Sequence, residues 1–240
     1  MGFLQRRRKT SEMFDTKVYD KALIAEIRRL TSSTKHMIDL DDELKTIEFV
    51  VFDTETTGFF PYAGDKIISI GAVKLKEGEI KESFHCLVNP EREVPKEIEE
   101  LTGIYNHELQ DKPKILEAAL DFLRFAENTY LVAHCADFDL HFLDVALKRG
   151  ANTRLLHPII DTMMLSYHLH PDWTSHHFDV ILEKYQIPII DRHSALGDAK
   201  MTALLFQFFL KQLEERGIKT IGALKRSIPS VCRQAPYIRF

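Results

Sequence analysis

The stretch Phe49-Val50-Val51-Phe52-Asp53-Thr54-Glu55 decides the expected fold of this chain. Its first four residues form a short apolar run, which is typical of strands that are buried on both faces of a sheet. The run ends at two acids, Asp53 and Glu55. Their spacing of two residues places both carboxylates on the same face if the extended backbone continues. The sequence therefore predicts a buried strand that brings a pair of acids to one end of a sheet.

The rest of the central region also shows strand and helix patterns. Residues 67–75 and 83–88 have strand character and are joined by a turn at Glu77-Gly78-Glu79, which predicts an antiparallel meander. Strands that come first, followed by helices alternating with strands, indicate an α/β fold with a mixed sheet flanked by helices. We expect helices at 98–101, 115–125, 139–148 and 179–185, a strand at 130–133, and a last long helix to residue 213 with Ser194 as its N-cap.

The composition excludes several classes of protein. Hydrophobic residues make up 45% of the 240 residues and charged residues 28%, which is enough for one sizeable domain with its own core. No stretch reaches the ~18 apolar residues of a membrane span, and the first residues lack a signal-peptide pattern, so we expect a soluble, cytoplasmic protein. Cys86, Cys135 and Cys232 are too few and too scattered for a disulfide framework or a sulfur-ligated metal site. Any metal must therefore be held by oxygen or imidazole.

Charge divides the chain into three parts. Residues 1–45 combine a basic start at 6–9 with helical periodicity over 23–30, residues 46–215 hold 16 Lys/Arg and 28 Asp/Glu, and residues 216–240 hold six basic residues and no acid. We expect an N-terminal helical extension, a central domain and a basic tail with these boundaries. The acidic surplus fits either solubility or a cation-binding site. The basic start and tail fit either phosphate-binding tracks or solvated, partner-binding segments.

Two more acids and a histidine accompany the first pair. Asp139 follows the predicted strand 130–133 at the start of a predicted helix, where a capping role would also explain it. Asp198 follows His193 by five residues. Acids gathered beside a hydrophobic core repel each other and lose hydration, and a hard divalent cation is the usual compensation. Exposed acids at a strand end are the alternative reading of the first pair.

Together these residues occupy three segments that resemble the exonuclease motifs of the DEDDh (DnaQ-like) 3′ to 5′ exonucleases: 52–58, 134–139 and 193–198. The likeness covers roughly residues 46–212, and segments 67–75 and 101–104 also resemble family sequence. The family includes RNase T, oligoribonuclease and the epsilon proofreading subunit of bacterial DNA polymerase III, which the first motif resembles most. The resemblance implies an RNase H-like fold with a mixed five-stranded sheet flanked by helices.

The resemblance also implies a mechanism. Asp53, Glu55, Asp139 and Asp198 would gather two Mg²⁺ or Mn²⁺ ions, with Asp53 between them, and His193 would act as general base. The reaction would release nucleoside 5′-monophosphates from single-stranded DNA or frayed 3′ ends. An exoribonuclease of the RNase T or oligoribonuclease type is the first alternative, and a non-catalytic subunit that binds a DNA polymerase is the second. A DNA polymerase is also a candidate partner.

Several other residues are expected at the substrate. By resemblance, Thr56, Thr57 and Gly58 would hold the terminal nucleotide, and a glycine there also lets a backbone approach a ligand closely. Ile104 would wedge near the terminal bases by the same resemblance. His134 either shapes the site or is a buried, hydrogen-bonded histidine.

The aromatic pair that follows the first motif has two interpretations. Phe59 and Phe60 either stack on a base or belong to the core. The chain also departs from the family pattern at Cys135, where many relatives have asparagine, and at Ser69, where many have an acid. Neither residue replaces a metal-binding carboxylate, so the departures concern substrate preference.

Overall fold

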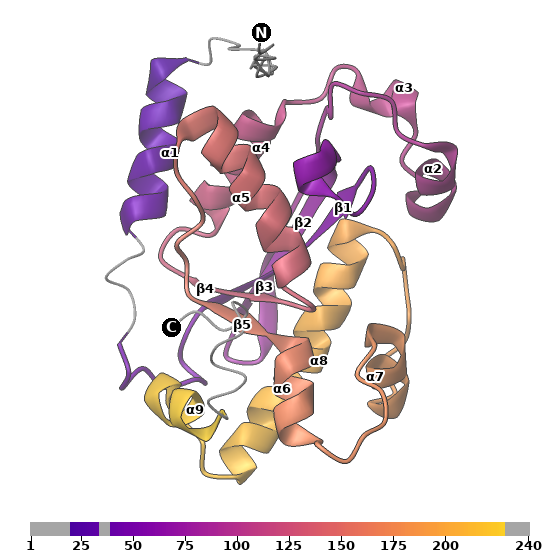
Figure 1. Ribbon diagram of the computed structural model, residues 1–240. Coiled ribbons are helices and arrows are strands. Elements are labelled where there is room, and N and C mark those ends of the chain that lie inside the picture. Colours follow the sequence, from indigo (N-terminus) through magenta and orange to yellow (C-terminus); the bar gives the residue numbers. More distant parts are fainter. Residues whose placement is uncertain (1–19, 34–38, 229–240) are drawn as a thin grey trace, which may run out of the picture.

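A five-stranded sheet with helices on both faces organises residues 20–33 and 39–228, which the computed structural model describes (Figure 1). The five strands and the helices confirm the predicted α/β class. The elements are α1 (Lys21–Ser33), β1 (Phe49–Thr56), η2 (Pro61–Ala63), β2 (Ile67–Lys76), β3 (Glu79–Leu87), α2 (Lys96–Thr102), α3 (Asn106–Leu109), α4 (Ile115–Phe125), β4 (Tyr130–Ala133), α5 (Asp137–Ala151), β5 (Ile159–Asp161), α6 (Thr162–Leu169), α7 (Phe178–Lys184), α8 (Ala195–Glu215) and α9 (Ile221–Ser227).

The strand β1 lies in the middle of the sheet. The strand order is β3-β2-β1-β4-β5, with β1, β2 and β3 antiparallel and β4 and β5 parallel to β1. Val50 and Phe52 pack in a core cluster with α1, α4 and α5, whereas Phe49 and Val51 pack on the opposite face with α6, α7, α8 and α9. Both faces of β1 are buried, which explains why its first half is a continuous apolar run.

The predicted elements agree with the structure in type, and the differences lie mostly at their ends. The helix at 115–125 and the strand at 130–133 have the predicted bounds. Ser194 is the N-cap residue of α8, as predicted, although its side chain makes no capping hydrogen bond. Sequence periodicity did not locate β5, because a three-residue strand is too short to show a period, nor α6, whose eight residues are only weakly amphipathic.

Both ends of the described chain contribute to the core. Ile27 and Leu30 of α1 lie in the cluster under α4 and α5, and Ile221 and Leu224 of α9 lie in the opposite cluster. The predicted domain boundaries after residues 45 and 215 stay predictions. Arg6 to Lys9, Arg233 and Arg239, which carry much of the predicted basic tracks, lie outside the described residues. Within the described ranges, none of the helices has the length and apolar character needed to cross a membrane.

Candidate active site

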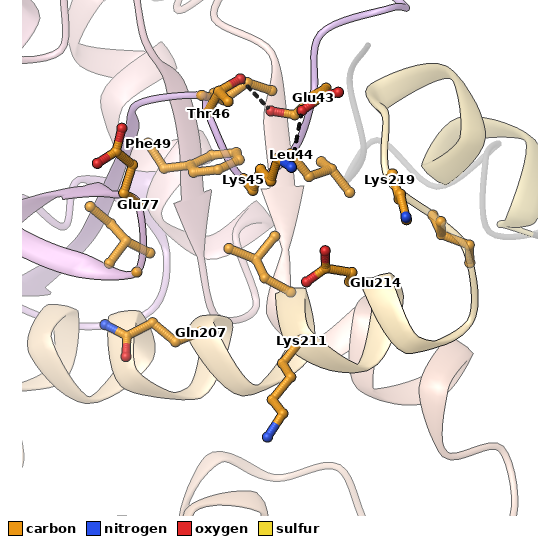
Figure 2. Close-up of a pocket in the computed structure, with 15 residues that line it drawn as sticks. Glu43, Leu44, Lys45, Thr46, Phe49, Glu77, Gln207, Lys211, Glu214 and Lys219 are labelled. Carbon is orange, nitrogen blue, oxygen red and sulfur yellow. Dashed lines mark hydrogen bonds and ion pairs between the residues drawn. The ribbon is translucent and has the colours of Figure 1, made fainter.

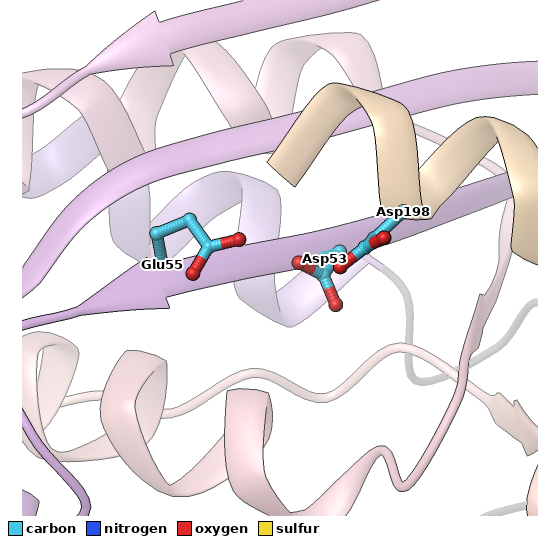
Figure 3. Close-up of side chains that lie close together, drawn as sticks. All are labelled: Asp53, Glu55 and Asp198. Atoms are coloured by element: carbon cyan, nitrogen blue, oxygen red, sulfur yellow. The ribbon is translucent and has the colours of Figure 1, made fainter. Parts of the chain in front are cut away.

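Three carboxylates meet at the end of the apolar run of β1 (Figure 3). Asp53 and Glu55 project from β1, and Asp198 comes from the first turn of α8. One ligand oxygen from each lies within 4.8 Å of the others. The spacing of two residues therefore brings Asp53 and Glu55 together as predicted. The third acid, Asp198, comes from α8, which follows the last strand of the sheet in sequence.

Gly71 of β2 allows α8 to come this close to the sheet. Gly71 is paired with Asp53 in the antiparallel register. A Cβ atom at this position would lie 2.2 Å from the carbonyl carbon of Ala195, the first residue of α8. Because glycine has no side chain, the first turn of α8 rests directly on the strand beside β1. This close approach places Asp198 next to Asp53.

Asp139 reaches the same end of β1 from the first turn of α5. Its Oδ1 accepts hydrogen bonds from the backbone N–H of Thr54, at 2.9 Å, and from the Thr54 hydroxyl, at 2.6 Å. Asp139 and Thr54 are both buried. Asp139 is not one of the three acids in the close group. Its hydrogen bonds hold it to Thr54, the residue of β1 that lies between Asp53 and Glu55.

Burial raises the pKa values of all four acids, and the charges of neighbouring site acids add to the shift for Asp53 and Glu55. The pKa of Asp53 is well above its ordinary range because of burial first and then the charges of Asp139, Glu55 and Asp198. Burial raises the pKa of Glu55 to about 8, and nearby acids add to the shift. Burial raises the pKa of Asp139 to about 7, although its hydrogen bonds from Thr54 oppose the shift. A divalent cation would relieve this repulsion.

Asp198 has one oxygen held and one oxygen without a partner. Its Oδ2 forms an ion pair with Arg192 and accepts a hydrogen bond from the backbone N–H of His193 at 3.3 Å. Its Oδ1 is buried and has no hydrogen-bond partner among the described residues. Burying a carboxylate oxygen without a partner costs free energy, and a hard cation is a partner that suits such an oxygen. The donor set therefore fits Mg²⁺ or Mn²⁺.

His193 lies immediately before α8 in a left-handed backbone conformation with φ of 61°. Its side chain is partly exposed, and its Nδ1 is 3.5 Å from Nη1 of Arg192.

Arg192 also forms an ion pair with Asp179 at 2.7 Å and lies over the ring of Phe178. The turn is tight, because a Cβ at Gly197 would lie 2.3 Å from the carbonyl oxygen of Asp191. These contacts place an imidazole beside Asp198.

The turn after β1 is held together by its own hydroxyl groups. The Thr56 hydroxyl donates to the carbonyl oxygen of Gly58 at 2.6 Å, and the Thr57 hydroxyl accepts from the backbone N–H of Lys66 at 3.0 Å. A Cβ at Gly58 would lie 2.4 Å from Oδ2 of Asp65, so a larger residue there would have to displace the Asp65 carboxylate. The turn borders the carboxylates, and nucleotide binding by these three residues stays a prediction.

The other predicted substrate residues differ in exposure. Phe59 and Phe60 are 69% and 68% exposed, so the core alternative is wrong for both. Ile104 packs in a small buried cluster with Ile68. His134 Nδ1 lies 2.9 Å from the Thr162 hydroxyl, and burial lowers its pKa to about 4. Roles at the substrate stay predictions for Ile104 and His134.

Sequence reasoning missed three residues that fix the site. Thr54 and Arg192 hold the carboxylates of Asp139 and Asp198. Asp161, at the end of β5, accepts hydrogen bonds from the backbone N–H groups of Cys135 and Ala136 and so holds the start of α5. Only Asp161 carries a usable signal, because an acid between an apolar run and a helix is a typical N-cap. Thr54 is defined by a partner distant in sequence, and Arg192 by a turn that brings it back to Asp198 without a periodic pattern.

A pocket of about 480 Å³ lies away from these carboxylates, between segment 43–49 and the C-terminal half of α8 (Figure 2). Apolar side chains line it, among them Leu44, Phe49 and Leu210, and charged side chains surround them. None of the five predicted catalytic residues is in its lining. The predicted catalytic residues therefore lie outside this pocket.

The sheet order, with helices on both faces and acids at the end of the central strand, is that of the RNase H-like exonuclease fold. The chain belongs to the RNase T family of exonucleases, whose family model matches residues 50–206. It is 40% identical over 177 residues to a DNA polymerase III of the PolC type from Caldanaerobacter subterraneus. It is also 40% identical over 186 residues to a DNA polymerase III subunit epsilon-like protein from Rhodobacter capsulatus.

These alignments cover most of this chain and a small part of each relative. They include 74% of this chain and 12% of the PolC-type protein, and 75% of this chain and 26% of the epsilon-like protein. Two solved structures share the fold. One is the nuclease domain of 3′hExo, a DEDDh family member bound to rAMP (TM-score 0.62, 19% identity, 75% of this chain and 97% of that chain). The other is exonuclease X with 5′ overhanging duplex DNA (TM-score 0.56, 21% identity, 76% and 99%).

Proposed function

We propose that this chain is a metal-dependent 3′ to 5′ exonuclease of the DEDDh type that releases nucleoside 5′-monophosphates from DNA. The observation that carries the proposal is the group of Asp53, Glu55 and Asp198, with an unpartnered buried oxygen on Asp198. Asp139, held beside the group by Thr54, supplies the fourth acid. Asp53, Glu55, Asp139 and Asp198 would together hold two divalent cations.

Each of the chain's own residues has a role in this proposal. Two Mg²⁺ or Mn²⁺ ions supply charge stabilisation for the attacking and leaving oxygens of a phosphodiester. Thr54 and Arg192 fix the acids that hold them. His193 removes a proton from the attacking water, a role open to a partly exposed imidazole near neutral pH. The turn Thr56-Thr57-Gly58 positions the terminal nucleotide.

The preference for DNA rests on the relatives. Proteins named as DNA polymerase III, of the PolC type or epsilon-like, align with most of this chain at 40% identity. The same relatives support a DNA polymerase as partner, since this chain corresponds to a part of much longer proteins. RNA is the second candidate substrate, because the structurally similar 3′hExo domain holds rAMP.

Hydrolysis of single strands labelled at the 3′ or the 5′ end tests the proposal. DNA and RNA strands are incubated with Mg²⁺, Mn²⁺ or EDTA, using the wild-type protein, Asp53→Ala, and Asp121→Ala as a control that removes an exposed acid of α4 away from the site. We expect metal-dependent loss of the 3′ nucleotide that Asp53→Ala abolishes and Asp121→Ala leaves intact. Activity near the wild-type rate in folded Asp53→Ala would refute the metal assignment. Faster degradation of RNA than of DNA would replace the DNA preference.

A further inference from the structure

A basic pocket lies on α5, on the side where that helix contacts η2. Its volume is about 240 Å³, and its lining consists of Tyr62, Asp144, Val145, Lys148, Arg149 and Arg154. Lys148, Arg149 and Arg154 are exposed. The lining therefore holds three basic side chains and one acid, in a domain whose overall charge is strongly negative. None of the proposed catalytic or metal-binding residues belongs to it.

The positive charge in this pocket is poorly neutralised by the protein. The described residues provide no ion pair to Arg149 or Arg154, and Lys148 donates to the neutral side chain of Asn152 at 2.8 Å. Oδ1 of Asp144 accepts a hydrogen bond from the backbone N–H of Leu155. The effect extends to Lys66, whose pKa is lowered by burial and by the charges of Arg149 and Arg92. The pocket is therefore suited to an anion.

Exposed aromatic side chains connect this pocket with the carboxylates. Phe59 contacts Phe138, the neighbour of Asp139, with ring centroids 6.1 Å apart. Tyr62, which is 71% exposed, contacts His141 one helical turn further along α5, also at 6.1 Å. From Asp139 to Lys148 the helix rises about 14 Å. Aromatic faces followed by basic groups are the combination that binds single-stranded nucleic acid without reading its sequence.

We infer that the pocket of Lys148, Arg149 and Arg154 binds backbone phosphates of a single nucleic acid strand at nucleotides outside the one being cleaved. Tyr62 in the pocket lining and Phe59 beside Phe138 provide stacking surfaces on the way to the acids. This inference deepens the proposed function and rests on it. A stretch of strand that contacts this pocket is held while the terminal nucleotide is removed. The pocket is therefore a determinant of affinity for long strands and contributes nothing to the chemical step.

Arg149→Gln/Arg154→Gln tests the pocket, and Lys45→Gln/Lys211→Gln, which removes the same charge from the pocket beside α8, is the matched control. Binding of a fluorescein-labelled oligothymidylate is measured by anisotropy over a range of salt, in an Asp53→Ala background so that the strand is not degraded. We expect the arginine pair to lose about tenfold in affinity, and its salt slope to become shallower by about 1.4, since each phosphate contact contributes ~0.7 for single strands. The lysine pair should keep the wild-type affinity and slope.

A small substrate separates this inference from the proposed function. The p-nitrophenyl ester of thymidine 5′-monophosphate reaches only the acids, so in the background with Asp53 intact the arginine pair should hydrolyse it at the wild-type rate while its KM for the oligonucleotide rises. Equal affinities and salt slopes for the two double variants would refute the pocket. Binding of polyglutamate that depends on the same arginines and matches that of oligothymidylate would assign the pocket to acidic peptides instead. If the wild type hydrolyses neither substrate, the proposed function fails, and the binding measurement still decides the pocket.

Discussion

The close contact between β2 and α8 makes Gly71→Ala the sharpest test of how the fold builds the site. The added methyl carbon would lie 2.2 Å from the carbonyl carbon of Ala195 and 2.2 Å from the backbone nitrogen of Leu196. Non-bonded carbon atoms normally lie ~3.5 to 4.0 Å apart, so the strand and the helix must separate by more than about 1 Å. Both neighbouring atoms are backbone, so no side-chain rotation relieves the clash.

The separation acts directly on the acids, because Gly71 pairs with Asp53 and the displaced helix turn carries Asp198. A shift of about 1 Å in a reacting constellation is enough to lower a rate by roughly a hundredfold. Overpacking of this kind also lowers the free energy of unfolding by about 1–3 kcal/mol. We expect Gly71→Ala to be folded, less stable, weaker in Mn²⁺ binding and strongly impaired in hydrolysis.

Calorimetric titration of Mn²⁺, hydrolysis of a 3′-labelled strand and urea unfolding measure these effects separately. Gly150→Ala is the control, because its Cβ would lie 2.4 Å from Cδ1 of Leu116, a side chain that can move, in the core between α4 and α5. We expect this control to lose stability and to keep its Mn²⁺ affinity. Wild-type Mn²⁺ affinity and rate in folded Gly71→Ala would refute the argument that this contact sets the distance between Asp53 and Asp198.

Three further predictions concern the charges at the site. In EDTA, the free energy of unfolding should fall as pH rises from about 6.5 to about 8, because the raised pKa values of Asp139 (about 7) and Glu55 (about 8) keep more protons on the folded than on the unfolded chain in this window. Urea midpoints that stay level or rise over this range would contradict it. Thr54→Val removes one hydrogen bond to Asp139, which lowers the free energy of unfolding by about 1–2 kcal/mol. Because this bond lowers the pKa of Asp139, its loss should shift the acidic limb of the pH–rate profile to higher pH. An unshifted limb would show that Thr54 does not control the pKa of Asp139. His193→Ala should lower the rate by a factor of about 10² to 10⁴ and retain Mn²⁺ binding in calorimetry, and an unchanged pH–rate profile would assign the base to another group.

The sequence by itself determined the local features of this protein. The apolar run of β1 and its two acids follow from residue type and spacing alone, as does the helix at 115–125. The resemblance of three short segments to exonuclease motifs then indicated the family, which the match over residues 50–206 shows. Each of these signals lies within a few neighbouring residues, so each can be identified from the sequence before the fold is known.

Only the tertiary structure decided how these parts meet. Asp198 is beside Asp53 because α8 rests on a glycine of β2, and Asp139 is beside Thr54 because α5 packs across the other face of the sheet. Arg192 holds one oxygen of Asp198, and the basic pocket on α5 is bordered by η2 from the turn after β1. Most of these contacts join residues far apart along the chain, and the Arg192–Asp198 pair depends on the shape of a turn. Periodicity and propensity report only on near neighbours, and side-chain packing between elements fixes these distances.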